Sequence, residues 1–63
     1  MITLNGKENK TYDNLNELLR ENNFRKERIA VEINGVIIKK DDYEITPIED
    51  GDTIEVVAFM GGG

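Results

Sequence analysis

The chain has 63 residues, a formal net charge of −5, and neither histidine nor cysteine. A domain this short buries only about 60% of its unfolded surface, so it has little structure with which to enclose a catalytic pocket. The missing residue types exclude an imidazole base, a thiol nucleophile and a zinc site built from either, and the acidic balance argues against nucleic acid as a partner.

The chain begins with a predicted hairpin. Residues 1–4 are expected to form a short strand, and Asn5-Gly6 the tight turn after it, because both residues tolerate positive φ. The return strand is expected over residues 8–12, with Tyr12 at its end.

A helix follows the hairpin. Asn14 and Glu17 have the spacing of a capping box, in which each side chain binds an unpaired amide of the first turn. The helix is expected to end at Asn22 or Asn23. Three leucines recur on one face of this helix: Leu15, Leu18 and Leu19.

A second hairpin is predicted after the helix. Apolar and polar residues alternate over residues 29–33, which indicates a half-buried strand. Asn34-Gly35 repeats the turn signal, and residues 36–38 form the expected return strand.

The remaining chain is expected to end in a central strand. Residues 39–44 are charged and predict a turn or a single helical turn anchored by Tyr43. Pro47 limits any strand over residues 45–48 to an edge or a very short one. The longest β-rich stretch covers residues 53–60, and three glycines follow it.

The order hairpin, helix, hairpin, strand predicts an α+β fold of the β-grasp type: a mixed sheet of four to five strands with one main helix on one face. We expect a single domain over residues 1–60 and a flexible glycine tail over residues 61–63. The predicted core comprises Ile2, Leu4, Leu15, Leu18, Leu19, Ile29, Val31, Ile33, Ile54 and Val56.

Charge is distributed unevenly along the chain. Every Lys and Arg lies at or before Lys40, whereas only acidic charges follow: Asp41, Asp42, Glu44, Glu49, Asp50, Asp52 and Glu55. None of these carboxylates has the spacing of a calcium-binding loop, so no metal site is predicted. Two explanations of this charge asymmetry have equal weight: a solvated acidic face, and an acidic surface that binds a basic partner.

The glycine tail is the strongest candidate for chemistry. Three residues without side chains can extend about 10 Å. They can also pass through an enzyme channel that is too narrow for residues with side chains. They end in the Gly63 carboxylate, which is ionised at neutral pH and is able to attack the α-phosphate of ATP.

Several segments taken together resemble the ThiS family, the ubiquitin-like sulfur carriers of the thiamine pathway. The resemblance covers essentially the whole chain and rests on residues 1–6, 15–19, 29–35, 50–52 and 56–63. Its most specific part is Asp-Gly-Asp, an alternating strand and a terminal Gly-Gly in that order. The resemblance implies that the last strand lies between the first and third strands and pairs parallel with the first.

The resemblance also implies a function for the tail. A ubiquitin-activating-type adenylyltransferase would adenylate Gly63, and a cysteine desulfurase would supply sulfur to form a thiocarboxylate. Thiazole synthase would then take that sulfur into the thiazole ring of thiamine. The chain would be a carrier and not an enzyme, binding no cofactor of its own because the partner uses ATP. A cytoplasmic location without membrane association is expected.

Further residues are predicted to recognise these partners. Gly61 and Gly62 would lie in the channel of the activating enzyme. Residues at and before the end of the last strand would form a docking surface with an acidic rim, namely Val57, Phe59 and Met60 with Asp50, Asp52 and Glu55.

Three alternatives remain open from the sequence. The small subunit of molybdopterin synthase shares the fold and the Gly-Gly end, although such chains tend to be longer. A ubiquitin-like protein modifier shares the activation step. A plain interaction module would carry the tail without using it.

Overall fold

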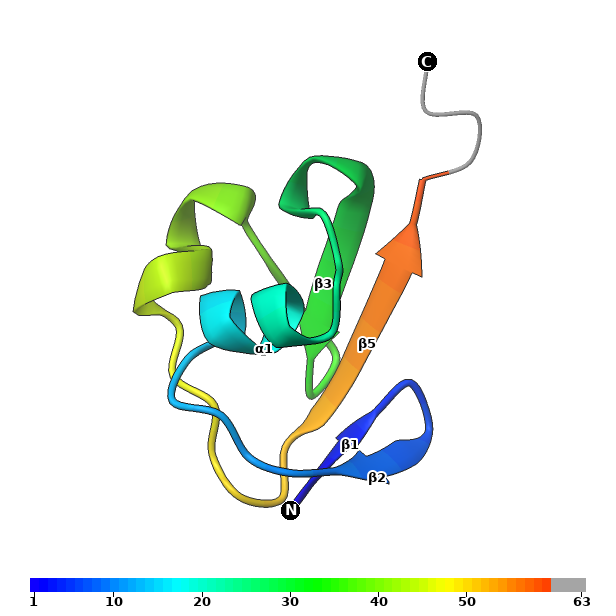
Figure 1. The fold of residues 1–63 in the computed structure, drawn as a ribbon, viewed down its shortest axis with the longest axis vertical. Helices are drawn as coiled ribbons and strands as arrows, with labels where there is room; N and C mark the ends of the chain where they lie inside the picture. Colours follow the sequence, from blue (N-terminus) through cyan, green and yellow to red (C-terminus); the bar gives the residue numbers. More distant parts are fainter. Residues whose placement is uncertain (60–63) are drawn as a thin grey trace.

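The computed structural model describes residues 1–59, in which two short hairpins flank a helix and precede a longer strand (Figure 1). Met60 and the glycines that follow it lie outside the described residues, as does the predicted boundary between domain and tail. The elements are β1 (Ile2–Leu4), β2 (Lys7–Asn9), α1 (Leu15–Glu21), the 3-10 helix η1 (Lys26–Arg28), β3 (Ile29–Ile33), β4 (Val36–Ile38), the 3-10 helix η2 (Lys40–Ile45) and β5 (Thr53–Ala58).

One mixed sheet contains all five strands, in the order β2-β1-β5-β3-β4. β5 is central, parallel to β1 and antiparallel to β3, and α1 crosses one face of the sheet (Figure 1). The β-grasp fold and the parallel pairing are therefore confirmed. No helix in the described part of the chain is long and apolar enough to cross a bilayer.

Both hairpins turn on an Asn-Gly pair. Asn5 and Asn34 have φ angles of 51° and 52°, and Gly6 and Gly35 have φ angles of 83° and 85°. Two successive residues with positive φ match the turn that follows the twist of paired strands.

Local signals at both ends set the length of α1. At its start, the Glu17 amide donates a 2.8 Å hydrogen bond to Asn14 Oδ1, as the capping pattern predicts. The Glu17 carboxylate accepts from the Asp13 amide at 3.3 Å, one residue before the cap. At the other end Asn23 has a φ of 63°, and the Phe24 amide donates to the Leu19 carbonyl oxygen at 2.9 Å. This pattern is a Schellman motif, which ends the helix.

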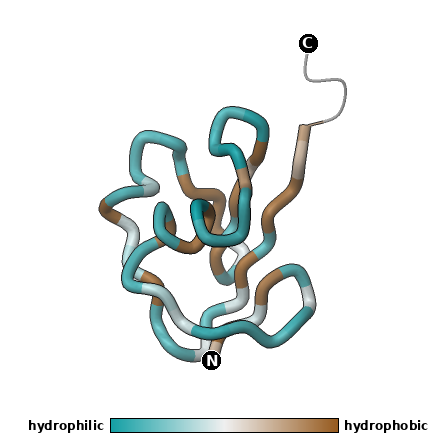
Figure 2. Tube along the Cα trace, in the orientation of Figure 1, coloured by the Kyte–Doolittle hydropathy of each residue, from teal (hydrophilic) through white to brown (hydrophobic). Residues whose placement is uncertain are grey.

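The core lies between α1 and the sheet. Every residue predicted for the core is buried, and three more residues join it: Tyr12, Ile48 and the predicted anchor Tyr43 of η2. Figure 2 shows apolar residues recurring along β5, whereas the turns are mostly hydrophilic.

The structure corrects the predicted ends of two strands. β2 ends at Asn9 and does not reach Tyr12, which lies in the connection to α1 and accepts a 3.2 Å hydrogen bond from Asn22 Nδ2. As Pro47 predicts, residues 45–48 form no full strand, and Pro47 makes only an isolated bridge to Asn14. β5 ends at Ala58, not at Met60.

Candidate functional site at the end of the central strand

β5 presents opposite faces to the core and to solvent. Ile54 and Val56 are buried under α1, whereas Val57 and Phe59 are 61% and 56% exposed. The Phe59 amide donates a 2.8 Å hydrogen bond to the Arg28 carbonyl oxygen, which holds the chain where it leaves the sheet. We call residues 57–59, the end of β5 and the residue after it, the tail root.

The sheet face opposite α1, here called the outer face, carries both apolar and acidic side chains. Val57 pairs with Ala30 across β5 and β3, and Glu55 pairs directly with Glu32. Ile37 of β4 pairs with Glu32 in turn and is 72% exposed. Like charges at directly opposite positions are unfavourable for the sheet, so the Glu32 and Glu55 pair is not explained by stability.

Asp50 and Asp52 do not lie beside the tail root. They precede β5, so the whole strand of six residues, about 20 Å long, separates them from Phe59. Asp50 forms an ion pair with the N-terminus of Met1. The Asp52 carboxylate accepts from Asn34 Nδ2 at 3.0 Å and from the Glu49 amide at 2.9 Å. Their observed contacts fasten the turn before β5.

Of the predicted acidic rim, only Glu55 shares the outer face with Val57. The structure therefore brings together Val57, Phe59 and Glu55, and it separates them from Asp50 and Asp52. Met60, Gly61, Gly62 and Gly63 lie outside the described residues. Among residues 1–59, no three carboxylates approach one another closely enough to hold a metal ion.

Basic residues lie close to the tail root, and the sequence reasoning missed them. Arg25 and Lys26 are exposed, and they lead through Arg28 into β3. Because Ile29 of β3 pairs with Ala58 of β5, this basic segment lies at the end of the sheet where the tail leaves. The signal was present in the sequence: antiparallel pairing of the two strands places residues 25–28 beside the end of the last strand.

Comparisons with known proteins agree with this geometry. The family model described as ThiS family matches residues 2–63. The sulfur carrier protein ThiS of Bacillus subtilis is 36% identical over 66 residues, with full coverage of both chains. A crystal structure of the thiamine biosynthesis protein (ThiS) from Geobacter metallireducens superposes with a TM-score of 0.82 at 34% identity, covering 98% of this chain and 97% of that one.

Some relatives are longer than this chain. A thiazole synthase of Paramagnetospirillum magneticum is 44% identical over 46 residues, and the match spans 73% of this chain but 14% of the relative. The chain also spans 65% of an uncharacterized protein, ycf40, of Porphyra purpurea at 39% identity.

Proposed function

Because the chain belongs to the ThiS family, we propose that it is a sulfur carrier of thiamine biosynthesis whose working group is the Gly63 carboxylate. The chain itself is not a catalyst. It binds no cofactor, and ATP is bound by the partner enzyme that activates it.

Activation begins at the terminal carboxylate. A carboxylate oxygen of Gly63 attacks the α-phosphorus of ATP, pyrophosphate leaves, and an acyl-adenylate forms. The outer sulfur of a persulfide on a cysteine desulfurase attacks the acyl carbon and displaces AMP, and two electrons from a thiol reductant then cleave the S–S bond of the acyl disulfide to leave a thiocarboxylate at Gly63. Thiazole synthase then transfers that sulfur to its substrate, and an oxygen atom from that substrate or from water takes its place on the acyl carbon, which restores the Gly63 carboxylate.

The absence of other groups suited to the task supports this assignment. The chain has no cysteine or histidine, and the side-chain carboxylates do not lie on a thin extended segment. Glycines without Cβ atoms allow an enzyme to surround the tail closely. The exposed Val57 and Phe59 support docking of the activating enzyme at the tail root.

Thiazole synthase as the receiving enzyme has separate support. Proteins named thiazole synthase contain a segment similar to this chain, in Paramagnetospirillum magneticum and in Magnetococcus marinus. A carrier joined to its acceptor enzyme in one polypeptide is a natural arrangement for two partners that react with each other, because the link raises their effective concentration.

The observation that carries the proposal is the family match, which extends through Gly63. In the structure, Val57 near the end of the central strand and Phe59 just after it are apolar and exposed. The test follows adenylation by pyrophosphate exchange with the activating enzyme, and sulfur loading by intact mass. The parent chain is expected to gain a thiocarboxylate at Gly63.

Three tail variants sharpen the test. Deleting Gly63, changing Gly62→Ala, or appending one residue after Gly63 is expected to abolish or impair activation, because a misplacement of about 1 Å can cost ~100-fold in rate. The melting temperature is expected to stay unchanged. Sulfur gained by the extended variant at its new terminus, or found on any other residue, would contradict the proposal.

The same experiment separates the alternatives. A chain attached to lysine side chains through an isopeptide bond would indicate a protein modifier. A thiocarboxylate that transfers sulfur to molybdopterin synthase and not to thiazole synthase would indicate the other carrier pathway. No covalent change with ATP and the activating enzyme would indicate an interaction module.

A further inference from the structure

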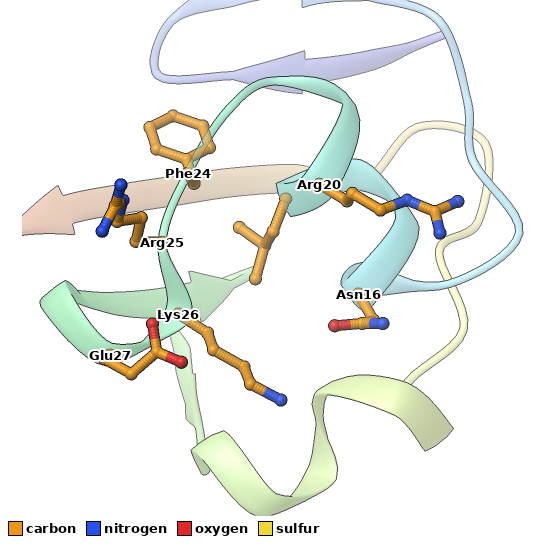
Figure 3. Close-up of a pocket in the computed structure, with 7 residues that line it drawn as sticks. Asn16, Arg20, Phe24, Arg25, Lys26 and Glu27 are labelled. Atoms are coloured by element: carbon orange, nitrogen blue, oxygen red, sulfur yellow. The ribbon is translucent and has the colours of Figure 1, made fainter.

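A hollow open to solvent lies where α1 ends and η1 begins (Figure 3). Its volume is about 240 Å³, and small-molecule sites usually enclose roughly 300–1,000 Å³. The hollow is therefore slightly smaller than such sites, and it is open to solvent. We call it the cationic hollow, and it is lined by Asn16, Leu19, Arg20, Phe24, Arg25, Lys26 and Glu27.

The end of α1 gives the cationic hollow its shape. The positive φ of Asn23 turns the chain back, and the hydrogen bond from the Phe24 amide to the Leu19 carbonyl oxygen holds the turn. Leu19 is buried and Phe24 is half-buried against the core, so the two residues supply the apolar part of the lining. A surface already formed in the free chain loses little entropy when a partner binds.

The charge of the cationic hollow is opposite to that of the whole chain. Arg20, Arg25 and Lys26 line it with a single carboxylate, that of Glu27, in a protein of net charge −5. Within residues 1–59 none of the three cations forms a salt bridge, although acidic residues outnumber basic ones by 13 to 8. In Figure 3 the three cationic side chains diverge: Arg20 extends away from the segment of Arg25 and Lys26, Arg25 lies on the side of Phe24, and Lys26 extends towards the space between α1 and η2. The cations that line the cationic hollow are therefore available to carboxylates of a partner.

The cationic hollow lies at the same end of the molecule as the tail root. The η1 segment that borders it continues into β3, and the Arg28 carbonyl oxygen accepts the Phe59 amide. Phe59 and Val57 lie on the outer face, whereas the hollow lies on the helix side. A partner that surrounds the tail thus meets an apolar surface on one side and a cationic one on the other.

Specificity for this chain has to come from such surfaces. Three glycines offer no side chains by which an enzyme could distinguish this tail from another glycine tail, so the folded domain must be recognised. A second copy of this chain is a poor occupant of the hollow, because two copies of net charge −5 repel each other.

We propose that the cationic hollow receives an acidic segment of the adenylating enzyme. Carboxylates of that segment face Arg25 and Lys26, and an apolar side chain contacts Phe24. This inference rests on the proposed function, since it assigns a second contact to the enzyme that activates Gly63.

The test measures pyrophosphate exchange by the adenylating enzyme with variants of the full chain. Arg25→Glu and Lys26→Glu are each expected to raise KM for the chain about tenfold and to leave kcat within about twofold, because they place like charges in contact without touching the reacting carboxylate. Lys7→Glu on the edge strand β2 is the matched control, with the same change in charge, and KM is expected to stay within about twofold of the parent value. Arg25→Lys keeps the charge and is expected to restore most of the affinity.

The salt dependence gives a second measurement. The KM of the parent is expected to rise more steeply with ionic strength than that of Arg25→Glu, since salt screens the attraction that the variant has lost. Thermal melting establishes that each variant is folded.

Two failures are distinguishable in this experiment. If Arg25→Glu and Lys26→Glu have the same KM as Lys7→Glu, the docking inference is wrong while the proposed function stands. A reduced sulfur transfer to thiazole synthase with unchanged exchange would also overturn it, because the occupant would be the other enzyme. If the parent chain supports no exchange at all, the proposed function fails and the inference fails with it.

Discussion

Two asparagine side chains complete the hydrogen bonding of β5. Asn5 Oδ1 accepts from the Val56 amide at 2.7 Å, and Asn34 Oδ1 accepts from the Thr53 amide at 2.9 Å. Each asparagine also takes the positive φ of its hairpin turn. A residue that was predicted only for its turn conformation thus has a second structural role, as a bond between the turn and the central strand.

Replacing Asn5 tests that second role. Asn5→Gly keeps the turn conformation but leaves the part-buried Val56 amide without its acceptor, so the free energy of unfolding is expected to fall by about 1–3 kcal/mol in urea denaturation. Asn5→Ala is expected to lose about 1 kcal/mol more, because a Cβ is strained at this φ. Asn5→Asp retains an acceptor and is the control. Parent-like stability of Asn5→Gly would show that the hydrogen bond contributes nothing.

The pKa of Tyr43 predicts a loss of stability in alkali. Burial raises the pKa of its hydroxyl above the ordinary value of 10.0, because desolvation disfavours the phenolate. Above pH 10 the unfolded chain loses this proton more readily than the folded chain, so the stability present below pH 10 falls as pH rises towards the folded-state pKa. Tyr43→Phe removes this contribution. We therefore expect the melting temperature to fall more between pH 9 and pH 11 in the parent than in the variant. Equal falls would contradict the assignment.

At the scale of elements, α1 depends on the sheet for its stability. Its seven residues span about 10 Å, which is too short for a helix to persist alone in water. The Asn14 cap and the Asn23 turn define its ends, whereas Leu15, Leu18 and Leu19 provide the buried face.

Leu18→Ala tests the packing of α1 on the sheet. Leu18 is fully buried, so its truncation is expected to lower the free energy of unfolding by about 2–5 kcal/mol, a large share for so small a domain. Glu8→Ala on the exposed strand β2 is the control, with a change within about 0.5 kcal/mol. Urea denaturation of both variants makes the comparison. A Leu18→Ala protein that unfolds at the parent's urea concentration would contradict the helix-on-sheet arrangement.

At the scale of the whole molecule, β5 separates an end with acidic residues in a turn from an end with basic residues beside the tail root. The turn before it is fastened by Asp50 and Asp52, and the tail leaves from the opposite end, beside the basic residues of the cationic hollow. Partner recognition is therefore expected at the end of the molecule where the tail leaves. Changes to exposed residues there can weaken partner binding without affecting folding.

Phe59→Ala tests the outer-face contact with the adenylating enzyme. Because Phe59 is 56% exposed, removal of its ring is expected to leave the melting temperature nearly unchanged. The affinity measured by calorimetry is expected to fall about tenfold or more, as for an aromatic residue at the centre of an interface. Ile45→Ala is the control, since Ile45 of η2 is 75% exposed and lies outside the proposed surfaces. Unchanged affinity in a folded Phe59→Ala protein would exclude Phe59 from the interface.

Most of the fold could be predicted because its signals are local. Alternation places residues of β3 and β5 on one face, and the spacing of the leucines places them on one side of α1. The Asn-Gly pairs specify the turns, and the capping pattern specifies the start of the helix. Each of these preferences acts over a few residues, so it can be recognised without knowledge of the remaining chain. The glycine tail and the role proposed for Gly63 also come from the sequence.

Other features depended on tertiary structure. Tyr12 and Ile48 lie in irregular segments, where no period indicates which side chain is buried. The role of Asp52 follows from its contact with Asn34, which is distant in sequence. The acidic rim was predicted because Asp50 and Asp52 are close to Phe59 in sequence. The extended strand β5 lies between them, so they are far apart in space. The same geometry brings residues 25–28 to the tail root, because antiparallel pairing joins the start of one strand to the end of another.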